Sequence, residues 1–450
     1  MAAAHNQPAR MSTIDHPLGV GAASPLKVPE PKRTRFAFYL LRTAEALAVA
    51  AFVSFCVIWV QAQASAPGVS RLSGDFVSFW TAGQLVLEGR AADAYVRLPH
   101  LLLQLALHGD PTWGYLAFFY PPFFLLLCAG FALLAYFPAL CLWLATGCAA
   151  YVAALRGLLP KSLGENSRVW VLFLGYPAVM INASYGQNGF LSTALLGAAA
   201  VWLDRWPLLA GVCFGCLSYK PQLGIIVPLA LATAGRWRCF AAAAATVLAL
   251  SAAATLAFGP GIWPAFFAGM AEARRSWMEP ANPLYLQYWV TVYGALRLHG
   301  GPLVLAYAAQ AVVGVAAACA LVYALRLRPA AVRSGRAEVA AIAACVPFCS
   351  PFLLEYDLLI LAVPMAWLLG EALRDGFRPG ERIALVAAYL APALFKVTLF
   401  DHAMKLFVIA AAGLLFVAVL RRMMFEARPC NLTSADAPLL DGRMPPRAPS

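Results

Sequence analysis

The sequence predicts an all-α, polytopic helical membrane protein. Of its 450 residues, 62% are hydrophobic and only 12% are charged, whereas a soluble domain is about half apolar and about a quarter charged. Apolar runs of about 17 to 25 residues recur along the chain, and this is the length that spans the hydrocarbon of a bilayer. The runs are continuous and rich in Ala and Leu, which favours helices over the alternating strands of a membrane barrel.

The two ends of the chain are polar and the part between them is apolar. Residues 1–35 contain several prolines and end in PKRTR, which predicts a disordered cytoplasmic tail. A first crossing at about 44–60 enters from the cytoplasm, because basic residues precede it. The long stretch 61–117 then forms a first external loop, whose amphipathic segments predict helices lying along the interface. The transmembrane domain covers 36–425, and residues 426–450 form a second disordered cytoplasmic tail.

The body of the chain contains enough apolar runs for a bundle of about 11–13 transmembrane helices. Several runs are short, which predicts tilted or re-entrant helices. The further crossings are expected at about 118–137, 139–155, 169–183, 188–203, 207–219, 222–235, 239–258, 302–325, 338–353, 356–373, 383–400 and 403–420. If 118–137 and 139–155 are both counted as full crossings, the later loops fall on the side of the membrane opposite to the one that their charges indicate. Either one of them does not span, or the loop with Lys161 and Arg168 is external.

Charge assigns the loops to two sides of the membrane. Arginines from Arg236 onward fall in alternate loops, which the positive-inside bias places in the cytoplasm. The same bias accounts for the net charge of +12 without a nucleic-acid partner. The intervening loops face outward with Asp75, and they carry the polar, non-basic motifs. The 11 cysteines are scattered, mostly in apolar segments, and no pair of CxxC motifs has zinc spacing.

Two charged residues of the outward side are candidates for chemistry. Asp75 lies just past the first crossing, where it is either a solvated loop acid or the base of a site at the bilayer surface. Lys220 lies between apolar runs, where a cation is costly unless it snorkels or pairs with an anion. Pro221 ends the preceding helix and leaves free backbone groups beside the ammonium, which suits a phosphate.

Other outward residues suit a sugar, and each has a plainer structural explanation. Gln187, Asn188 and Gln222 carry amides that bind hydroxyl groups, although amides also form turns and helix caps. Arg274 and Arg275 grip a phosphate or pair with Glu272 and Glu279. Tyr356 and Asp357 are further candidates for the sugar or the acceptor, although an acid at a helix start is also stabilised by the helix dipole.

Five motifs occur in a fixed order along the chain. GDFVSFWTAGQLVLEGRAADAY starts at Gly74 and is followed by FFYPPFF, GQNGFL, KPQLGIIVPLAL and SPFLLEYDLLIL. In order and spacing they resemble the membrane proteins of glycosyltransferase family 87, over roughly residues 36–425. That family belongs to the GT-C superfamily and includes mannosyltransferases that use polyprenyl-phosphate-mannose.

The resemblance implies a GT-C fold and a hexosyltransferase of the bacterial cytoplasmic membrane. The hexose, with mannose as the first candidate, would pass from a polyprenyl-phosphate donor to a lipid or glycan acceptor on the outer side. Asp75 matches the acid of the first external loop, the usual catalytic group of the superfamily. No second external acid lies directly beside it, so neither a metal ion nor another cofactor is expected. The expected partners are the donor, the acceptor and membrane lipids, and not nucleic acid.

Physical chemistry gives the same residues roles in such a transfer. Asp75 would take the proton of the acceptor hydroxyl as a general base. Lys220, with Arg274 or Arg275, would stabilise the departing phosphate. A single attack inverts the anomeric carbon, whereas double displacement needs a second carboxylate on the other face of the sugar.

Two other classes of protein remain compatible with a polytopic bundle. A secondary transporter would show related halves and acids within the membrane for coupling ions. A noncatalytic scaffold or flippase partner would leave Asp75 and Lys220 as ordinary interfacial charges. Use of a polyprenyl-phosphate sugar by the purified protein separates both from a transferase.

Overall fold

The computed structural model describes residues 49, 74–108, 114–327, 334–397 and 402–426. All of these residues belong to one compact unit of the chain. The predicted tails and the predicted first crossing at about 44–60 lie, apart from single residues, outside the described part.

The described chain is helical, with one isolated extended bridge between Trp289 and Leu354. The all-α prediction is confirmed. The helices, in order, are α2 (Gly74–Leu87), η1 (Ala91–Tyr95), α3 (Arg97–His108), α4 (Pro122–Ala132), α5 (Tyr136–Leu158), α6 (Lys161–Gly164), α7 (Ser167–Leu174), α8 (Pro177–Tyr185), α9 (Gly189–Trp202), α10 (Pro207–Cys216), η2 (Leu217–Tyr219), α11 (Pro221–Gly224), α12 (Val227–Thr233), α13 (Trp237–Phe258), α14 (Ile262–Ala273), η3 (Arg274–Met278), α15 (Pro283–Leu286), α16 (Val292–Leu298), α17 (Leu303–Leu327), α18 (Gly335–Cys349), η5 (Glu355–Leu361), α19 (Ala362–Asp375), α20 (Glu381–Val397) and α21 (His402–Glu426).

Length and composition identify the helices that can cross a membrane alone. Among the described residues, five stretches qualify: Tyr136–Leu158, Trp237–Phe258, Leu303–Leu327, Glu355–Asp375 and Met404–Met424. They make the protein a polytopic membrane protein, as predicted. Other passages are built from shorter helices, several of which begin at a proline, such as α8, α10 and α11. Proline is tolerated in a first helical turn and prevents the preceding helix from continuing.

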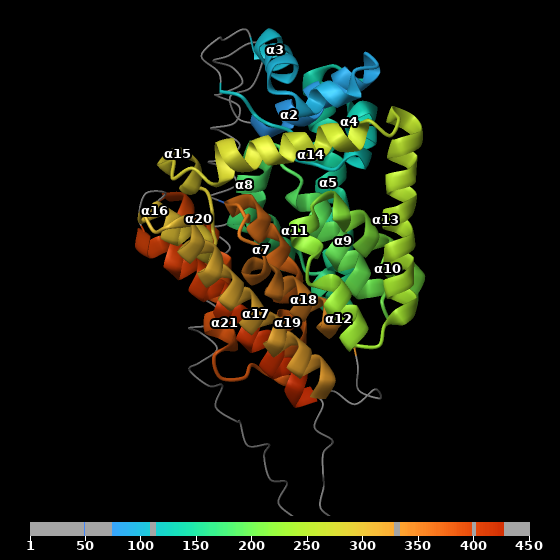
Figure 1. Ribbon diagram of the computed structural model, residues 1–450. Coiled ribbons are helices and arrows are strands. Elements are labelled where there is room, and N and C mark those ends of the chain that lie inside the picture. The colour runs from blue at the N-terminus through green and yellow to red at the C-terminus, as the bar shows by residue number, and fades with distance from the viewer. Residues whose placement is uncertain (1–48, 50–73, 109–113, 328–333, 398–401, 427–450) are drawn as a thin grey trace, which may run out of the picture. The chain divides into compact units, whose positions relative to one another are not determined.

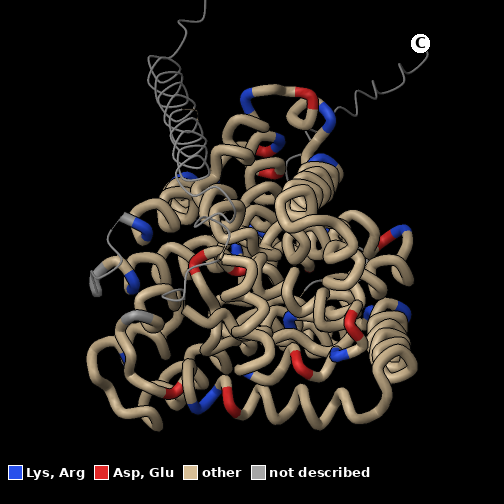
Figure 2. The backbone as a smooth tube through the Cα atoms, turned by 90° about the horizontal axis from the view of Figure 1, so that it is seen from above, with Lys and Arg blue, Asp and Glu red and all other residues tan. Residues whose placement is uncertain are grey.

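One end of the bundle, here called the basic end, holds clusters of arginines and acids. Arg236 before α13 pairs with Glu338 at 2.9 Å and with Asp204 at 2.8 Å, and so joins the starts of α13 and α18 to the turn after α9. Arg422 of α21 is fully buried and pairs with Asp375 at 3.2 Å and with Glu381 at 3.3 Å. These loops are the ones that the charge pattern assigns to the cytoplasm, and in Figure 1 the ends of α12, α13 and α19 lie together in the lower part. Figure 2 shows charged residues as isolated short segments on a tube that is otherwise mostly uncharged.

The structure accounts for the sidedness problem in the predicted crossings at 118–137 and 139–155. Helix α4 has only 11 residues and rises about 16 Å, roughly half of the hydrocarbon thickness. Helix α5 has 23 residues. Its start lies near α8, where Trp143 Nε1 donates to the Gly186 carbonyl at 3.0 Å, and its end leads to Pro160, which contacts Gly370 near the end of α19. Of the two segments, only α5 is long enough to span, and the loop with Lys161 and Arg168 follows it toward the basic end.

The opposite end carries helices that do not run along the bundle. Figure 1 shows α14 crossing the upper part of the bundle at a steep angle to α13, near α2 and α3. Gly269 of α14 lies against Tyr95 of η1, whose hydroxyl donates to the Tyr120 carbonyl at 2.9 Å. Residues 74–108 are therefore helical, as predicted for the first external loop.

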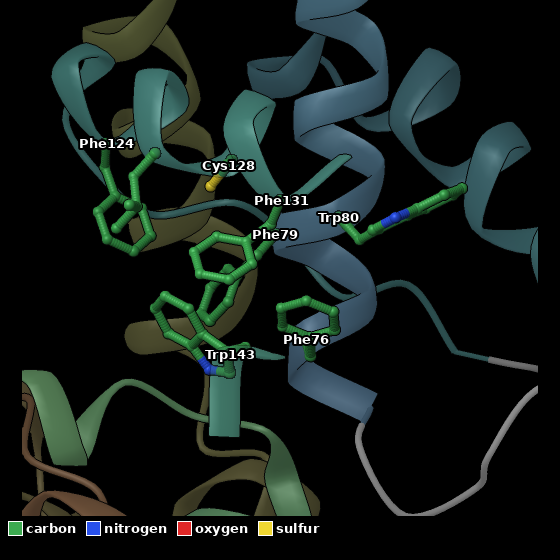
Figure 3. A pocket seen from close by; sticks show the side chains of 8 residues that line it. Phe76, Phe79, Trp80, Phe124, Cys128, Phe131 and Trp143 are labelled. Carbon is green, nitrogen blue, oxygen red and sulfur yellow. The ribbon is translucent and has the colours of Figure 1, made fainter. Parts of the chain in front are cut away.

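Aromatic packing anchors α2 on α4 and α5. Phe76 and Phe79 of α2 lie 6.0 and 5.9 Å from the Trp143 ring, measured between centroids, and Phe79 lies 5.7 Å from Phe124. Figure 3 shows these rings around a small apolar pocket. The backbones also approach closely, because a Cβ on Gly83 would lie 2.4 Å from the Cys128 carbonyl oxygen. This contact fixes the position of α2, whose first turn contains Asp75.

Candidate active site

Asp75 lies in the first turn of α2 and is partly buried. Its Oδ2 accepts a hydrogen bond from Gln187 Nε2 at 2.8 Å. The pKa of Asp75 is raised to about 6, chiefly by burial and in smaller part by the negative charges of Glu355 and Asp357. The hydrogen bond from Gln187 and the positive charge of Lys220 act in the opposite direction. A carboxyl group with such a pKa is ionised at neutral pH and is also a stronger base than an ordinary aspartate.

Gln187 holds the Asp75 carboxylate through a fixed amide orientation. Helix α8 ends at Gly186, whose φ of 65° is the left-handed conformation that glycine adopts easily. The next residue, Gln187, is buried, and its Oε1 accepts from the Tyr120 hydroxyl at 3.3 Å and from the Asn188 amide at 3.1 Å. These two donors occupy the oxygen side of the amide, so its NH₂ group faces Asp75.

Lys220 lies where the chain changes direction between η2 and α11. Its Nζ is 2.5 Å from Asp357 Oδ1 and 3.0 Å from Asn188 Oδ1, and it lies 4.8 Å from the centroid of the Tyr356 ring. The Lys220 and Asp357 side chains are almost completely buried. Lys220 is therefore paired with an acid. It does not snorkel, although snorkelling was the plainer of its two explanations.

The motif SPFLLEYD supplies the acid of this pair. Asp357 lies in the first turn of η5, and its Oδ2 accepts from the Leu354 backbone amide at 3.3 Å. Its position at a helix start agrees with the dipole explanation, and its pairing with Lys220 adds a second partner. Four of the predicted residues, Asn188, Lys220, Tyr356 and Asp357, thus meet in one cluster, and Gln187 links this cluster to Asp75.

A second charged cluster adjoins the first and was not predicted as part of the site. Glu355 Oε1 accepts from Lys396 Nζ at 2.7 Å and from the Tyr185 hydroxyl at 2.9 Å. Lys396 Nζ also donates to the Tyr185 hydroxyl at 2.6 Å and lies 5.5 Å from the centroid of the Tyr288 ring. Lys396 is a cation in the apolar run ALFKV at the end of α20, and such a residue is by default a functional candidate. That signal was sufficient to find Lys396 from the sequence.

Three predicted residues lie apart from these clusters. Arg274 pairs with Glu279 at 3.3 Å and Arg275 with Glu272 at 3.2 Å, and both arginine side chains are largely exposed. The alternative explanation for these arginines was pairing with Glu272 and Glu279, and the structure shows that pairing. Gln222 lies half-buried on α11, outside the hydrogen bonds that the described residues form around Lys220.

Among the described residues, no group of three or more His, Cys, Asp or Glu side chains is placed to hold a metal ion. The described cysteines are free thiols. The chemistry available at the site is that of a base with a raised pKa, buried ammonium–carboxylate pairs, amides and tyrosines.

Comparison with known proteins identifies a family for this chain. The profile of glycosyltransferase family 87 matches residues 118–351, which is just over half of the chain and includes Gln187, Asn188 and Lys220. Searches of curated proteins and of solved structures gave no match. Because the profile covers more than half of the chain and agrees with an all-helical membrane fold, the chain belongs to glycosyltransferase family 87.

Proposed function

We propose that this glycosyltransferase moves a hexose, with mannose as the first candidate, from a polyprenyl-phosphate donor to a hydroxyl of a lipid or glycan acceptor. The observation that carries the proposal is the placement of Asp75, a partly buried carboxyl group with a pKa of about 6, beside a cluster of amides, tyrosines and ammonium groups. A donor that already carries a phosphate leaving group needs a base for the acceptor and positive charge for the phosphate.

The reaction is a single displacement. Asp75 takes the proton of the acceptor hydroxyl, the acceptor oxygen forms a bond to the anomeric carbon, and the bond from that carbon to the phosphate oxygen breaks. The electron pair of that bond leaves with polyprenyl phosphate, and the anomeric configuration inverts. General-base catalysis of this kind contributes about 10²- to 10⁴-fold to the rate.

The other predicted residues have roles around this step. Lys220, neutralised by Asp357, orients Asn188 and supplies a positive charge that favours an ionised Asp75. Buried Asn188 Nδ2 has no hydrogen-bond partner among the described residues, which supports a ligand hydroxyl as its acceptor. Gln187, Gln222, Tyr356 and Asp357 are proposed to complete the sugar and acceptor contacts.

Arg274 and Arg275 occupy a different place in the proposal. Both are largely exposed near the helices of the first external loop, where an incoming anionic headgroup meets them first. Each would exchange its glutamate for the donor phosphate. Because exposed ion pairs contribute only about 0–1 kcal/mol, this exchange is inexpensive.

The proposed location is the bacterial cytoplasmic membrane, with the site facing outward. The positive-inside bias supports this orientation, because Arg236 and Arg422 lie at the end of the bundle away from Asp75. A membrane-embedded donor with a long polyprenyl chain also suits a bundle whose surface is apolar.

The experiment that tests the function measures transfer from labelled polyprenyl-phosphate-mannose and polyprenyl-phosphate-glucose into a membrane lipid extract. Native protein is compared with Asp75→Asn, which keeps the size and hydrogen bonding of the side chain but removes the base. We expect native protein to transfer sugar and Asp75→Asn to bind donor while its kcat falls about 10²- to 10⁴-fold.

Asp93→Asn is the matched control. Asp93 belongs to the same external stretch, but it is paired with Arg90 at 2.9 Å on the surface, and its variant should keep native activity. Full activity of Asp75→Asn would overturn the role of Asp75. A native protein that transfers neither sugar would favour another donor, a transporter or a noncatalytic scaffold.

A further inference from the structure

The second charged cluster contains a carboxylate that only half uses its hydrogen-bonding capacity. Glu355 is fully buried, and Oε1 accepts two hydrogen bonds, from Lys396 and from Tyr185. Oε2 is also buried and has no hydrogen-bond partner among the described residues. A buried carboxylate oxygen without a donor is costly, and native proteins rarely leave one in that state. A hydroxyl group of a ligand would supply the missing donor.

Lys396 complements Glu355 because it supplies hydrogen-bond donors where Glu355 supplies acceptors. An ammonium group has three N–H donors, and Lys396 uses two of them on Glu355 Oε1 and the Tyr185 hydroxyl. Its side chain is 36% exposed, in contrast to Lys220 at 3%. Of the two ammonium groups, Lys396 is therefore the one that an entering anion can reach without breaking a buried ion pair.

Two tyrosine rings flank this partly exposed ammonium. Lys396 Nζ lies 4.7 Å from the centroid of the Tyr185 ring and 5.5 Å from that of the Tyr288 ring, and both tyrosines are only partly buried. Tyrosine rings with one exposed face are suited to pack against the apolar face of a sugar ring.

The cluster is close enough to Asp75 to act on the same substrate. The charges of Glu355 and Asp75 both raise the pKa of Tyr288, after the larger effect of its burial. Glu355 likewise raises the pKa of Asp75. The ring centroids of Tyr185 and Tyr356 are also 5.9 Å apart, so Tyr185, Tyr288, Glu355 and Lys396 lie beside the cluster that adjoins the proposed base.

We infer that Tyr185, Tyr288, Glu355 and Lys396 form the subsite for the sugar-phosphate headgroup of the donor. Lys396 donates to a phosphate oxygen, and Glu355 Oε2 accepts a hydrogen bond from one hydroxyl of the sugar. This inference rests on the proposed function and assigns the phosphate of the bound donor to Lys396, whereas the sequence pointed to Lys220 with Arg274 or Arg275.

The phosphate contact is tested with polyprenyl phosphate, the product that carries no sugar. It should inhibit the native protein competitively against the donor. In Lys396→Met, which keeps the length of the side chain, the inhibition constant should rise about 10- to 100-fold, the value of one charge-assisted hydrogen bond. Lys396→Arg should restore inhibition to within a few-fold. Lys161→Met is the matched control, because Lys161 is an exposed lysine at the basic end, and its inhibition constant should not change.

The sugar contact is tested with a set of donors that lack one hydroxyl each. Native protein should discriminate against one of these deoxy donors by about 10- to 100-fold in kcat/KM, because that donor leaves Glu355 Oε2 unpaired. In Glu355→Gln an NH₂ group replaces the accepting oxygen, and discrimination at that position should fall to within about threefold. Lys396→Met should keep the discrimination, so the two variants separate the two contacts.

An unchanged inhibition constant in Lys396→Met, or unchanged discrimination in Glu355→Gln, overturns the corresponding contact. Failure of the proposed function itself would look different, because native protein would then transfer none of the donors. In that case thermal stabilisation in detergent by polyprenyl phosphate still decides the phosphate contact. Stabilisation of native protein and Lys161→Met but not of Lys396→Met would support the subsite, and equal stabilisation of all three would exclude it.

Discussion

At the scale of single residues, the behaviour of the site depends on the ionisation of Asp75. Burial and two neighbouring carboxylates oppose the charged form, and one hydrogen bond from Gln187 favours it. The base must be deprotonated to act, so kcat/KM should fall about tenfold per pH unit below about 6 and level off above that value. The hydrogen bond from Gln187 is therefore expected to set where this acid limb lies.

Replacing Gln187 by Met tests this role directly. The variant removes a hydrogen bond that lowers the pKa of Asp75, so that pKa should rise from about 6 by about one unit. The acid limb of kcat/KM then moves to higher pH. The loss of rate relative to the native protein should therefore be larger near pH 6.5 than near pH 8.5, which a pH–rate profile measures.

Gln84→Met is the control on the same helix as Asp75. The Gln84 amide donates to the Ala132 carbonyl at 2.6 Å and thus holds α2 on α4 without touching Asp75. Its pH profile should keep the native midpoint even where the maximal rate falls. An acid limb that stays in place in Gln187→Met would show that Gln187 does not control the base.

At the scale of elements, the position of Asp75 depends on how closely α2 approaches α4. A Cβ at Gly83 would meet the Cys128 carbonyl oxygen at 2.4 Å and the Ala132 Cβ at 2.7 Å. Gly83→Ala should therefore destabilise the protein by about 1–3 kcal/mol through overpacking. It should also lower kcat, because α2 must move away from α4 and carry Asp75 with it.

Gly130→Ala, on the partner helix α4, is expected not to destabilise the protein. Gly130 of α4 is exposed, and nothing lies within 4 Å of a Cβ built there. Ala in place of a helical Gly gains about 0.5–1 kcal/mol, so this variant should be as stable as the native protein or more stable. Thermal unfolding in detergent and initial rates measure both variants. Equal stability of the two would contradict close packing of α2 on α4.

The sequence predicted part of this arrangement, and long-range contacts explain the rest. Helix class, the helical first loop and the broken helix before Lys220 follow from local composition and from proline positions. Asp75, Asn188, Lys220 and Asp357 are candidates from the sequence because each is polar and lies next to an apolar run. Their pairing was not predicted, because Lys220 and Asp357 are 137 positions apart in the sequence and meet only in the folded chain.

Glu355 and Lys396 show the limit of local reasoning more clearly. Glu355 follows an apolar segment and resembles an ordinary acid at a helix start. Only the approach of α8 and α20 supplies its partners Tyr185 and Lys396. For Arg274 and Arg275, by contrast, local ion pairing was the simplest alternative, and acids three to five residues away do pair with them.

At the scale of the whole described unit, charge is separated from apolar surface. Large apolar side chains such as Leu256, Val304 and Leu248 are 70–87% exposed, which water would oppose and lipid tails accept. Charged side chains gather instead at the basic end, in the candidate site and near the first external loop, where Arg90 pairs with Asp93 and Arg275 with Glu272. At the basic end, buried Arg422 donates to the Glu371 and Gly376 carbonyls and pairs with Asp375, so the ends of α19, α20 and α21 are held together.

This separation predicts which side of the membrane each end faces. In a variant whose 11 native cysteines are replaced, one cysteine is introduced at an exposed position of either end, as Glu88→Cys after α2 or Arg238→Cys in α13. A membrane-impermeant maleimide applied to intact spheroplasts should label Glu88→Cys. It should label Arg238→Cys only after permeabilisation, because the arginine-rich loops stay in the cytoplasm. The reverse pattern would place Asp75 on the cytoplasmic side, where the acceptor would have to be one made and used inside the cell.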